Sequence, residues 1–285
     1  MKRALLLLAL LALGGLAVLT ALSAARAGLY DVAGLARAAP RRTALMRQRA
    51  QEARREGRPY RVTQAWVPYD RISPLLRRAV LVAEDDAFYQ HGGLDWNELA
   101  AAARKNLEKR RVVRGGSTIT QQLAKNLFLG DGRTLTRKLT EVFLALRMER
   151  TLSKRRIFEL YLNLIEWGDG TFGAEAAARR YFGTGAADLT PRQSVLLAAV
   201  IINPRRFSVL HPPRRIERRV RLIAGRLRRR GALSREQYDE VVGNRPPAPW
   251  WWLPEPSAPE TAAPAPAESA AADTPGAALS PPGPP

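Results

Sequence analysis

Residues 4–25 form an apolar stretch without a single charged side chain. At about 1.5 Å per helical residue, such a stretch is long enough to cross a bilayer core of about 30 Å. A cleavable signal peptide is the alternative, because Ala25-Arg26-Ala27 has small residues at a cleavage-like spacing. The apolar run exceeds the usual signal-peptide core of about 7 to 15 residues. We therefore favour a retained transmembrane anchor over residues 1–26.

The charges that flank this stretch leave its orientation open. Lys2 and Arg3 precede it and would hold the N-terminus in the cytoplasm. Arg26, Arg37 and other arginines follow it and weaken that preference.

The formal net charge of +20 is large, and it lies before residue 246, because residues 246–285 contain acidic side chains but no Lys or Arg. Such an excess suits an anionic membrane surface, a phosphorylated substrate or nucleic acid, and the anchor favours the first two. The chain has no cysteine, so disulfides and thiolate sites are excluded. With His91 and His211 as its only imidazoles, any metal would be a hard ion held by carboxylates and phosphate rather than a structural zinc.

Composition divides the rest of the chain into three parts. Residues 27–59 are rich in Arg and Ala and are interpreted as a basic connector. Residues 60–245 are interpreted as one mainly α domain, because few stretches alternate with a period of two. Residues 246–285 mix Pro with Ala, which does not build a core, so we expect a disordered tail. The cluster Trp250 to Trp252 would dock on the domain or sit at the lipid interface.

Helix signals are frequent between residues 60 and 245. Ser73 followed by Pro74 predicts a helix start, and Thr190-Pro191 with Gln193 predicts a capping box. Apolar stripes with a period of 3.6 predict further helices: Leu135, Leu139, Val142 and Leu146; Ile157, Leu160, Tyr161 and Leu164; and Ile216, Val220, Ile223 and Leu227 within the basic stretch 214–230. We interpret that basic helix as solvated or membrane-facing, and Lys154 and residues 161–163 mainly as packing.

The run from Gly115 to Leu129 reads G-G-S-T-I-T-Q-Q-L-A-K-N-L-F-L. Its two glycines allow the backbone to approach a ligand, and Ser117 or Thr118 can cap the helix that follows. Free amides and the positive end of the helix dipole at this start suit a phosphate. Thr118, Gln122 and Lys125 share one face of the helix, at i, i+4 and i+7. A capped structural helix is the alternative.

Glu84 is the candidate proton acceptor. It lies four residues after Val80, so its carboxylate projects from the apolar side of its helix, where burial raises its proton affinity. The alternative is a solvated acidic cluster of Glu84, Asp85 and Asp86 at a helix end.

A second charged group surrounds Glu141. Arg133, Arg137 and Lys138 precede it, and Arg137 and Glu141 are i, i+4 partners. A surface salt bridge is one explanation. Another sets these cations with Lys125 around a pyrophosphate, with Glu141 orienting them or a divalent ion.

Four ordered motifs resemble the peptidoglycan glycosyltransferase family, which includes the glycosyltransferase domains of class A penicillin-binding proteins. They read E-D-x-x-F-x-x-H-x-G-x-D from Glu84, the run from Gly115, R-K-x-x-E from Arg137, and K-x-x-I-x-x-x-Y-L-N from Lys154. The E-W-G-D-G-T-F-G-A-E stretch from Glu166 is similar to the monofunctional biosynthetic branch. The resemblance covers roughly residues 62–230, and no S-x-x-K follows that would indicate a transpeptidase.

The resemblance implies a lysozyme-like, mainly α domain on the periplasmic side of the bacterial inner membrane, held by a single transmembrane helix. It implies polymerisation of lipid II into β-1,4-linked glycan strands, with inversion and release of polyprenyl pyrophosphate. Expected partners are lipid II, the growing strand, membrane lipids and cell wall synthesis or division proteins, and not nucleic acid. No cofactor is required, although a Mg or Mn ion at the pyrophosphate, with Glu141 as a ligand, is compatible.

The resemblance also assigns roles to residues. Glu84 matches the general base and Glu141 the second acidic residue. The expected substrate-binding residues are Asp85, Phe88, His91, Ser117, Thr118, Gln121, Gln122, Lys125, Asn126, Arg133, Arg137 and Lys138.

Two other functions compete with this one. A lysozyme-like muramidase or lytic transglycosylase would cleave glycan with Glu84 as an acid, but Lys125, Arg133 and Arg137 would then have no role. A membrane-tethered basic binding module would explain the charge, but the basic segments lack the interleaved aromatic residues of single-strand nucleic-acid binders.

Overall fold

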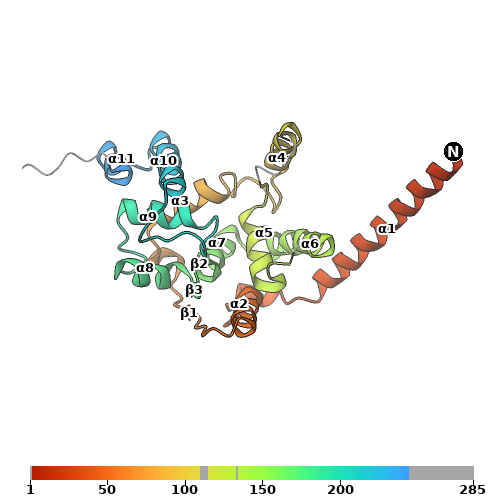
Figure 1. Cartoon of the computed structure of the whole chain (residues 1–285), viewed down its shortest axis with the longest axis horizontal. Coiled ribbons are helices and arrows are strands. Elements are labelled where there is room, and N and C mark those ends of the chain that lie inside the picture. The colour runs from red at the N-terminus through yellow and green to blue at the C-terminus, as the bar shows by residue number, and fades with distance from the viewer. Residues whose placement is uncertain (1, 110–114, 133, 244–285) are drawn as a thin grey trace, which may run out of the picture. The chain divides into compact units, whose positions relative to one another are not determined.

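The computed structural model describes residues 2–109, 115–132 and 134–243. The tail over residues 246–285 that we expect to be disordered, its cluster Trp250 to Trp252, and the candidate site residue Arg133 lie outside the described residues. The described part is mainly helical, with three short strands, which confirms the predicted fold class (Figure 1).

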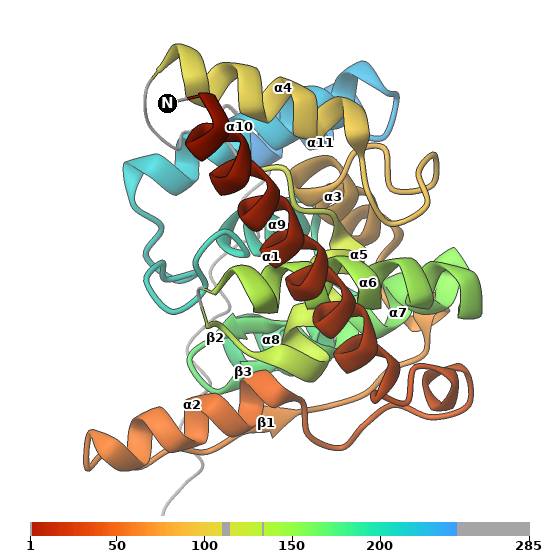
Figure 2. The ribbon, with the colours of Figure 1, turned by 90° about the vertical axis from the view of Figure 1, so that its right-hand side faces the viewer.

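Helix α1 (Lys2–Gly28) covers the apolar stretch, and within the described residues it is the one helix long and apolar enough to cross a membrane. Its leucines other than the half-buried Leu19 are exposed, Leu11 by 72%. The C-terminal part of α1 packs on α6 (Leu135–Thr151), where Ser23 Oγ donates to the Thr136 carbonyl oxygen over 3.4 Å. Figure 2 shows α1 in dark red crossing α6. Apolar side chains that face no protein are typical of a lipid-facing helix, so α1 fits the predicted anchor.

Helices α3, α9, α10 and α11 pack on one another, over Pro74–Glu84, Pro191–Val200, Arg214–Arg229 and Arg235–Val242. Ser73 caps α3, and Thr190 forms a capping box with Gln193, which confirms both predicted helix starts. The apolar stripe of α10 is buried. Its opposite side is not wholly solvated, however, because Arg219 and Arg226 donate to α3. The interpretation of α10 as a solvated or membrane-facing helix is therefore wrong for Arg219, which also pairs with Glu84, whereas Arg226 is exposed despite its bond to α3.

A second group of helices follows the glycine-rich run. Helix α5 (Ile119–Ala124) continues into a π-helical turn, η3 (Lys125–Leu129), and packs on α6 and on α7 (Lys154–Leu164). The predicted stripe of α7 is fully buried. On α6 the predicted stripe is only half-buried and Leu135 is 61% exposed, whereas Leu144, Ala145 and Met148 form the core face. Because α6 lies between α5 and α1, it carries apolar side chains on two sides, and the stripe alone did not identify the core face.

A small sheet and one further helix lie beside this group. Strand β3 (Thr171–Phe172) pairs parallel with β1 (Thr63–Gln64) and antiparallel with β2 (Glu166–Gly168). Helix α2 (Ala44–Arg55) packs against η3, as Figures 1 and 2 show. Gly173 has φ +87° and precedes α8 (Ala174–Phe182), and a Cβ there would lie 2.7 Å from the Asn163 carbonyl oxygen. Only glycine therefore fits between the sheet and α7.

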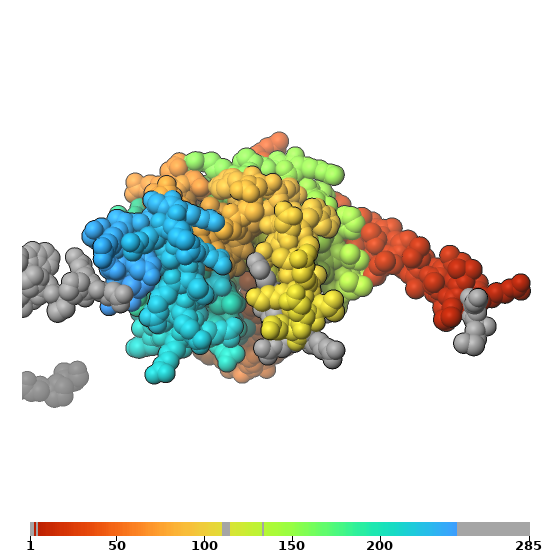
Figure 3. All heavy atoms as spheres, turned by 90° about the horizontal axis from the view of Figure 1, so that it is seen from above, coloured from red at the N-terminus to blue at the C-terminus, as the bar shows by residue number. Residues whose placement is uncertain are grey.

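The remaining elements connect these groups. They are η1 (Ala33–Ala36) after the anchor, η2 (Tyr69–Arg71) before α3, and α4 (Trp96–Glu108), which Asp95 caps. In Figure 3, α4 in yellow and α10 in cyan are both exposed on the face that also presents the orange segment around α3. Helix α3, which ends at Glu84, packs on α9 and α10, which are distant from it in sequence.

Candidate active site

Glu84 is the last residue of α3, and its side chain is only 11% exposed. Its Oε1 accepts a hydrogen bond from Arg219 Nη2 at 2.6 Å, and its Oε2 accepts one from Gln122 Nε2 at 3.2 Å. Burial raises the pKa of Glu84, while the charge of Arg219 and the bond from Gln122 partly oppose that rise. The carboxylate is therefore held in place and binds a proton more readily than an exposed one.

Gln122 has its amide orientation fixed by Tyr161. The Tyr161 hydroxyl donates to Gln122 Oε1 at 2.9 Å, so the amide nitrogen faces Glu84. Tyr161 is fully buried, and burial raises the pKa of its phenol well above the ordinary value, which keeps it a donor. Tyr161 therefore does more than the packing that its motif predicts.

The Asp85 carboxylate lies against the N-terminal end of α5. Its Oδ2 accepts the Ile119 amide at 2.9 Å, and both its oxygens lie within 3.1 Å of His91 Nε2. Because the Gly93 amide donates to His91 Nδ1, the ring hydrogen lies on Nε2 and points at Asp85. Burial raises the pKa of Asp85, and the bonds from His91 and Ile119 partly offset that rise. The Ile119 amide, one of the amides predicted to be free for a phosphate, is thus bonded to a carboxylate of the protein.

Other predicted site residues near this helix start have local partners. Thr118 Oγ1 donates to the Gly93 carbonyl oxygen at 2.7 Å and forms a capping box with Gln121. Phe88 is fully buried, and Lys154 Nζ lies 4.3 Å from its ring centroid. These side chains therefore have partners within the protein, whereas Gln122 donates to Glu84 itself.

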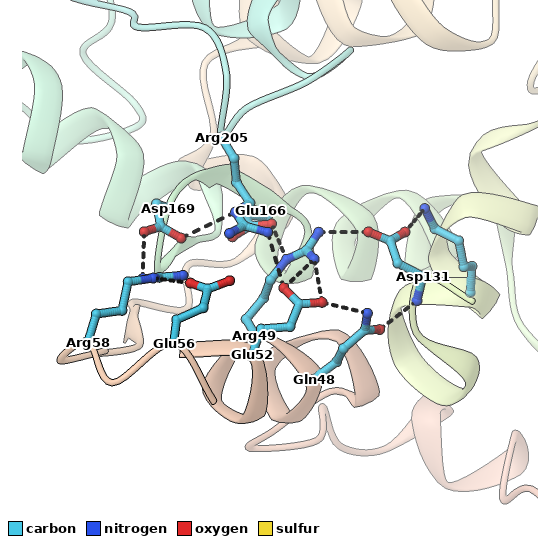
Figure 4. Close-up of polar contacts among 10 residues, drawn as sticks. Gln48, Arg49, Glu52, Glu56, Arg58, Asp131, Glu166, Asp169 and Arg205 are labelled. Carbon is cyan, nitrogen blue, oxygen red and sulfur yellow. Dashed lines mark hydrogen bonds and ion pairs between the residues drawn. The ribbon is translucent and has the colours of Figure 1, made fainter. Parts of the chain in front are cut away.

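A cavity of about 270 Å³ adjoins this group. Its lining includes Gln122, Lys125 and Asn126 from α5 and η3. Lys125 Nζ contacts Asp131 Oδ1 at 2.9 Å. Arg49 of α2 reaches the same cavity and pairs with Asp131 and Glu166, as Figure 4 shows. The helix that carries Gln122 thus links Glu84 to a cavity with cations in its wall.

The second acidic residue, Glu141, lies on α6 and is 2% exposed. Its Oε2 accepts from Arg137 Nη1 at 2.6 Å, and its Oε1 accepts from Lys138. Lys138 also donates to Ser117 Oγ at 3.0 Å, which ties α6 to the segment before α5. The Arg137 Nε–H is buried and has no acceptor among the described residues.

A metal ion has no prepared site among the described residues. No three acidic, histidine or cysteine side chains gather there as ligands. Both oxygens of Glu141 are engaged by cations, so it does not fit as the ligand of a resident ion.

The sequence profile of the Transglycosylase family matches residues 50–228, more than half of the chain. The chain belongs to the Transglycosylase family. A biosynthetic peptidoglycan transglycosylase of Chromobacterium violaceum is 52% identical over 162 residues, which are 57% of this chain and 71% of that protein. Proteins of the same name from Nitrosomonas eutropha and Nitrosospira multiformis are 47% and 44% identical over 188 residues, 66% of this chain and 77% and 82% of theirs.

Membership in the Transglycosylase family confirms the resemblance found in the sequence. The transglycosylase domain is lysozyme-like, in agreement with the mainly helical structure. The matched range runs from α2 to α10 and contains Glu84, Lys125 and Glu141.

Sequence reasoning missed the side chains that approach the site from distant elements. Arg219 lies on a helix interpreted as solvated, and Arg49 lies in a segment interpreted as a connector. Asp131 and Glu166 were given no role. A signal existed only for Glu166, because it opens the stretch that is similar to the monofunctional branch.

Proposed function

We propose that this chain is a peptidoglycan glycosyltransferase that polymerises lipid II into β-1,4-linked glycan strands in cell wall synthesis. Family membership and the names of the relatives support peptidoglycan glycosyl transfer. The observation that carries the detailed proposal is the link between a buried carboxylate, Glu84, and a cation-lined cavity through Gln122.

In the proposed reaction Glu84 is the general base. It takes the proton from the 4-hydroxyl of the acceptor sugar, and that oxygen attacks the anomeric carbon of the growing strand. The new C–O bond forms as the bond to the pyrophosphate breaks from the opposite face, so the configuration inverts and polyprenyl pyrophosphate leaves. Arg219 and Gln122 keep one lone pair on each carboxylate oxygen occupied and leave the other available for the hydroxyl.

Cations of two elements would hold the leaving pyrophosphate. Lys125 faces the cavity, and Arg137 and Lys138 lie in the first turn of α6. Electrostatic stabilisation of a departing dianion needs such fixed positive charge. Arg133 belongs to the same proposal on the basis of its motif position alone.

The apolar helix α1 supports a reaction at a membrane. We propose that α1 holds the catalytic domain on the periplasmic face of the bacterial inner membrane. Ser23 of α1 contacts Thr136, the neighbour of Arg137. The first of the proposed pyrophosphate-binding residues on α6 therefore lies close to α1. The pyrophosphate of a polyprenyl-linked substrate lies at that depth, because its hydrocarbon chain stays in the bilayer.

No step of the proposed reaction uses a metal ion, because Glu141 already binds Arg137 and Lys138. Mg or Mn carried by the pyrophosphate is compatible with the family, which generally requires no cofactor.

The test is to incubate the purified full-length protein with lipid II in detergent and separately with mature sacculi. We expect glycan polymer and released polyprenyl pyrophosphate from lipid II, and intact sacculi. Solubilised sacculi without polymer would instead favour a muramidase or lytic transglycosylase.

A further inference from the structure

We propose that Arg49 is a positioning residue for pyrophosphate binding, because it neutralises Asp131 and so frees Lys125 to bind the ligand. This inference rests on the proposed function, in which Lys125 holds the pyrophosphate of lipid II. It assigns a role to α2, a helix from a segment in which the sequence analysis identified no functional residue.

Arg49 is buried, and all three of its guanidinium nitrogens contact carboxylates. Nε lies 3.1 Å from Glu166 Oε2, Nη1 lies 3.0 Å from Glu52 Oε2, and Nη2 lies 2.7 Å from Asp131 Oδ2. Figure 4 shows Arg49 reaching between these acidic residues. A planar guanidinium group that pairs with three carboxylates is held in one orientation. Arg49 is therefore fixed relative to the cavity.

Asp131 bridges Arg49 and Lys125 with separate oxygens. Oδ1 accepts from Lys125 Nζ at 2.9 Å, while Oδ2 faces Arg49. The Asp131 backbone amide donates to Gln48 Oε1 at 2.6 Å, so α2 holds this residue from two sides. When Lys125 turns to a ligand, Asp131 keeps its bond to Arg49 and stays in place.

The net charge of the cavity lining depends on Arg49. Its lining includes three cations, Arg49, Lys125 and Arg205, and two carboxylates, Asp131 and Glu166. Without Arg49 the positive and negative charges would balance, and Asp131 would hold Lys125 while repelling an incoming pyrophosphate. Because these groups are partly desolvated, the repulsion is weakly screened.

A purely structural role is the competing explanation, since Arg49 also joins α2 to the buried Glu166 at the start of β2. The two roles differ in what Asp131→Asn should do in an Arg49→Gln background. If Arg49 acts by neutralising Asp131, removing the carboxylate restores binding. If Arg49 only holds α2 against β2, the second substitution does not restore binding.

The experiment measures kcat and KM of the full-length protein for lipid II polymerisation. We expect Arg49→Gln to raise KM about tenfold, the scale of one charge-assisted hydrogen bond, and to change kcat by less than about threefold. Adding Asp131→Asn should return KM to within about threefold of the wild type. Arg58→Gln is the matched control, because Arg58 pairs with Glu56 and Asp169 instead of with Asp131, and its KM should stay at the wild-type value.

A second pair of variants covers a folding defect, because Arg49→Gln leaves Glu166 buried without its cation. Arg49→Gln with Glu166→Gln removes both buried charges, and it should still raise KM and still respond to Asp131→Asn. An equal KM for the Arg49 and Arg58 variants, or a raised KM that Asp131→Asn does not lower, overturns the inference. A wild type without polymerase activity would overturn the proposed function instead.

Discussion

Arg219 of α10 donates to Glu84 of α3 at 2.6 Å, although 135 positions separate them in the sequence. Burial alone would favour the protonated acid, and a proton acceptor must be able to ionise. The cation moderates the effect of burial without removing it, because the net direction of the Glu84 pKa is still upward. The contact thus limits how far burial raises the pKa of Glu84.

The Arg219→Gln variant tests this contact. In the wild type, activity should fall with decreasing pH as Glu84 takes up a proton. The midpoint of this acid limb of the pH profile should lie above the ordinary glutamate pKa of about 4.3. Loss of the cation raises the pKa of Glu84 further, so the limb should move to higher pH. The measurement is kcat/KM for lipid II between pH 5 and 9. An unmoved or lowered limb contradicts the assignment.

Glu84→Gln should also change stability in a pH-dependent way. A carboxyl group with a raised folded pKa binds protons more tightly when folded, so it lowers stability as pH rises above about 4.3, the unfolded value. Glutamine carries no such charge. Thermal unfolding should therefore show a larger Tm advantage of the variant at pH 8 than at pH 5. A Tm deficit that grows with pH would mean that Glu84 is stabilised as the anion.

Lys125→Ala should weaken substrate use more than folding. The Lys125 side chain is 31% exposed, and Asp131 keeps Arg49 as a partner, so we expect a change in unfolding free energy of less than about 1 kcal/mol. The KM for lipid II should rise about tenfold or more, because a cation of the pyrophosphate site is lost. Unfolding by denaturant and steady-state kinetics measure the two effects. If the variant is strongly destabilised but its folded fraction keeps the wild-type KM, Lys125 has a structural role instead.

Removal of residues 1–28 should separate the anchor from the chemistry. The truncated chain loses the contact between Ser23 and Thr136 and its membrane attachment. We expect it to polymerise lipid II in detergent at a rate reduced severalfold, and to lose about tenfold or more in vesicles, where enzyme and substrate no longer share a surface. Circular dichroism checks that the domain is folded. Equal activity in vesicles would contradict a role for α1 as an anchor.

Local signals in the sequence predicted the elements well. The caps at Ser73 and Thr190 and the stripe of α7 depend on neighbours within a few residues, and all three agree with the structure. The core face of α6 was not predicted, because α1 and α5 cover different sides of that helix. Helix periodicity does not show which neighbour covers an apolar side.

The residues of the candidate site that lie on a single motif could be named from the sequence. Glu84, Gln122 and Lys125 were named from their helices, and Gln122 joins Glu84 to the cavity. Arg49 and Arg219 were missed because their partners are far away in the sequence: Glu166 for Arg49 and Glu84 for Arg219. A single sequence shows that a helix carries arginines but not which of them turn inward.

The most direct measurement is the rate of lipid II polymerisation by the wild type, Glu84→Gln and Glu56→Gln. Glu56 bonds only Arg58 among the described side chains, so it is a matched control for the change of glutamate to glutamine. We predict polymer from the wild type and from Glu56→Gln, and a rate at least about a hundredfold lower for a folded Glu84→Gln, the scale of a lost general base. Wild-type turnover by Glu84→Gln would contradict the account.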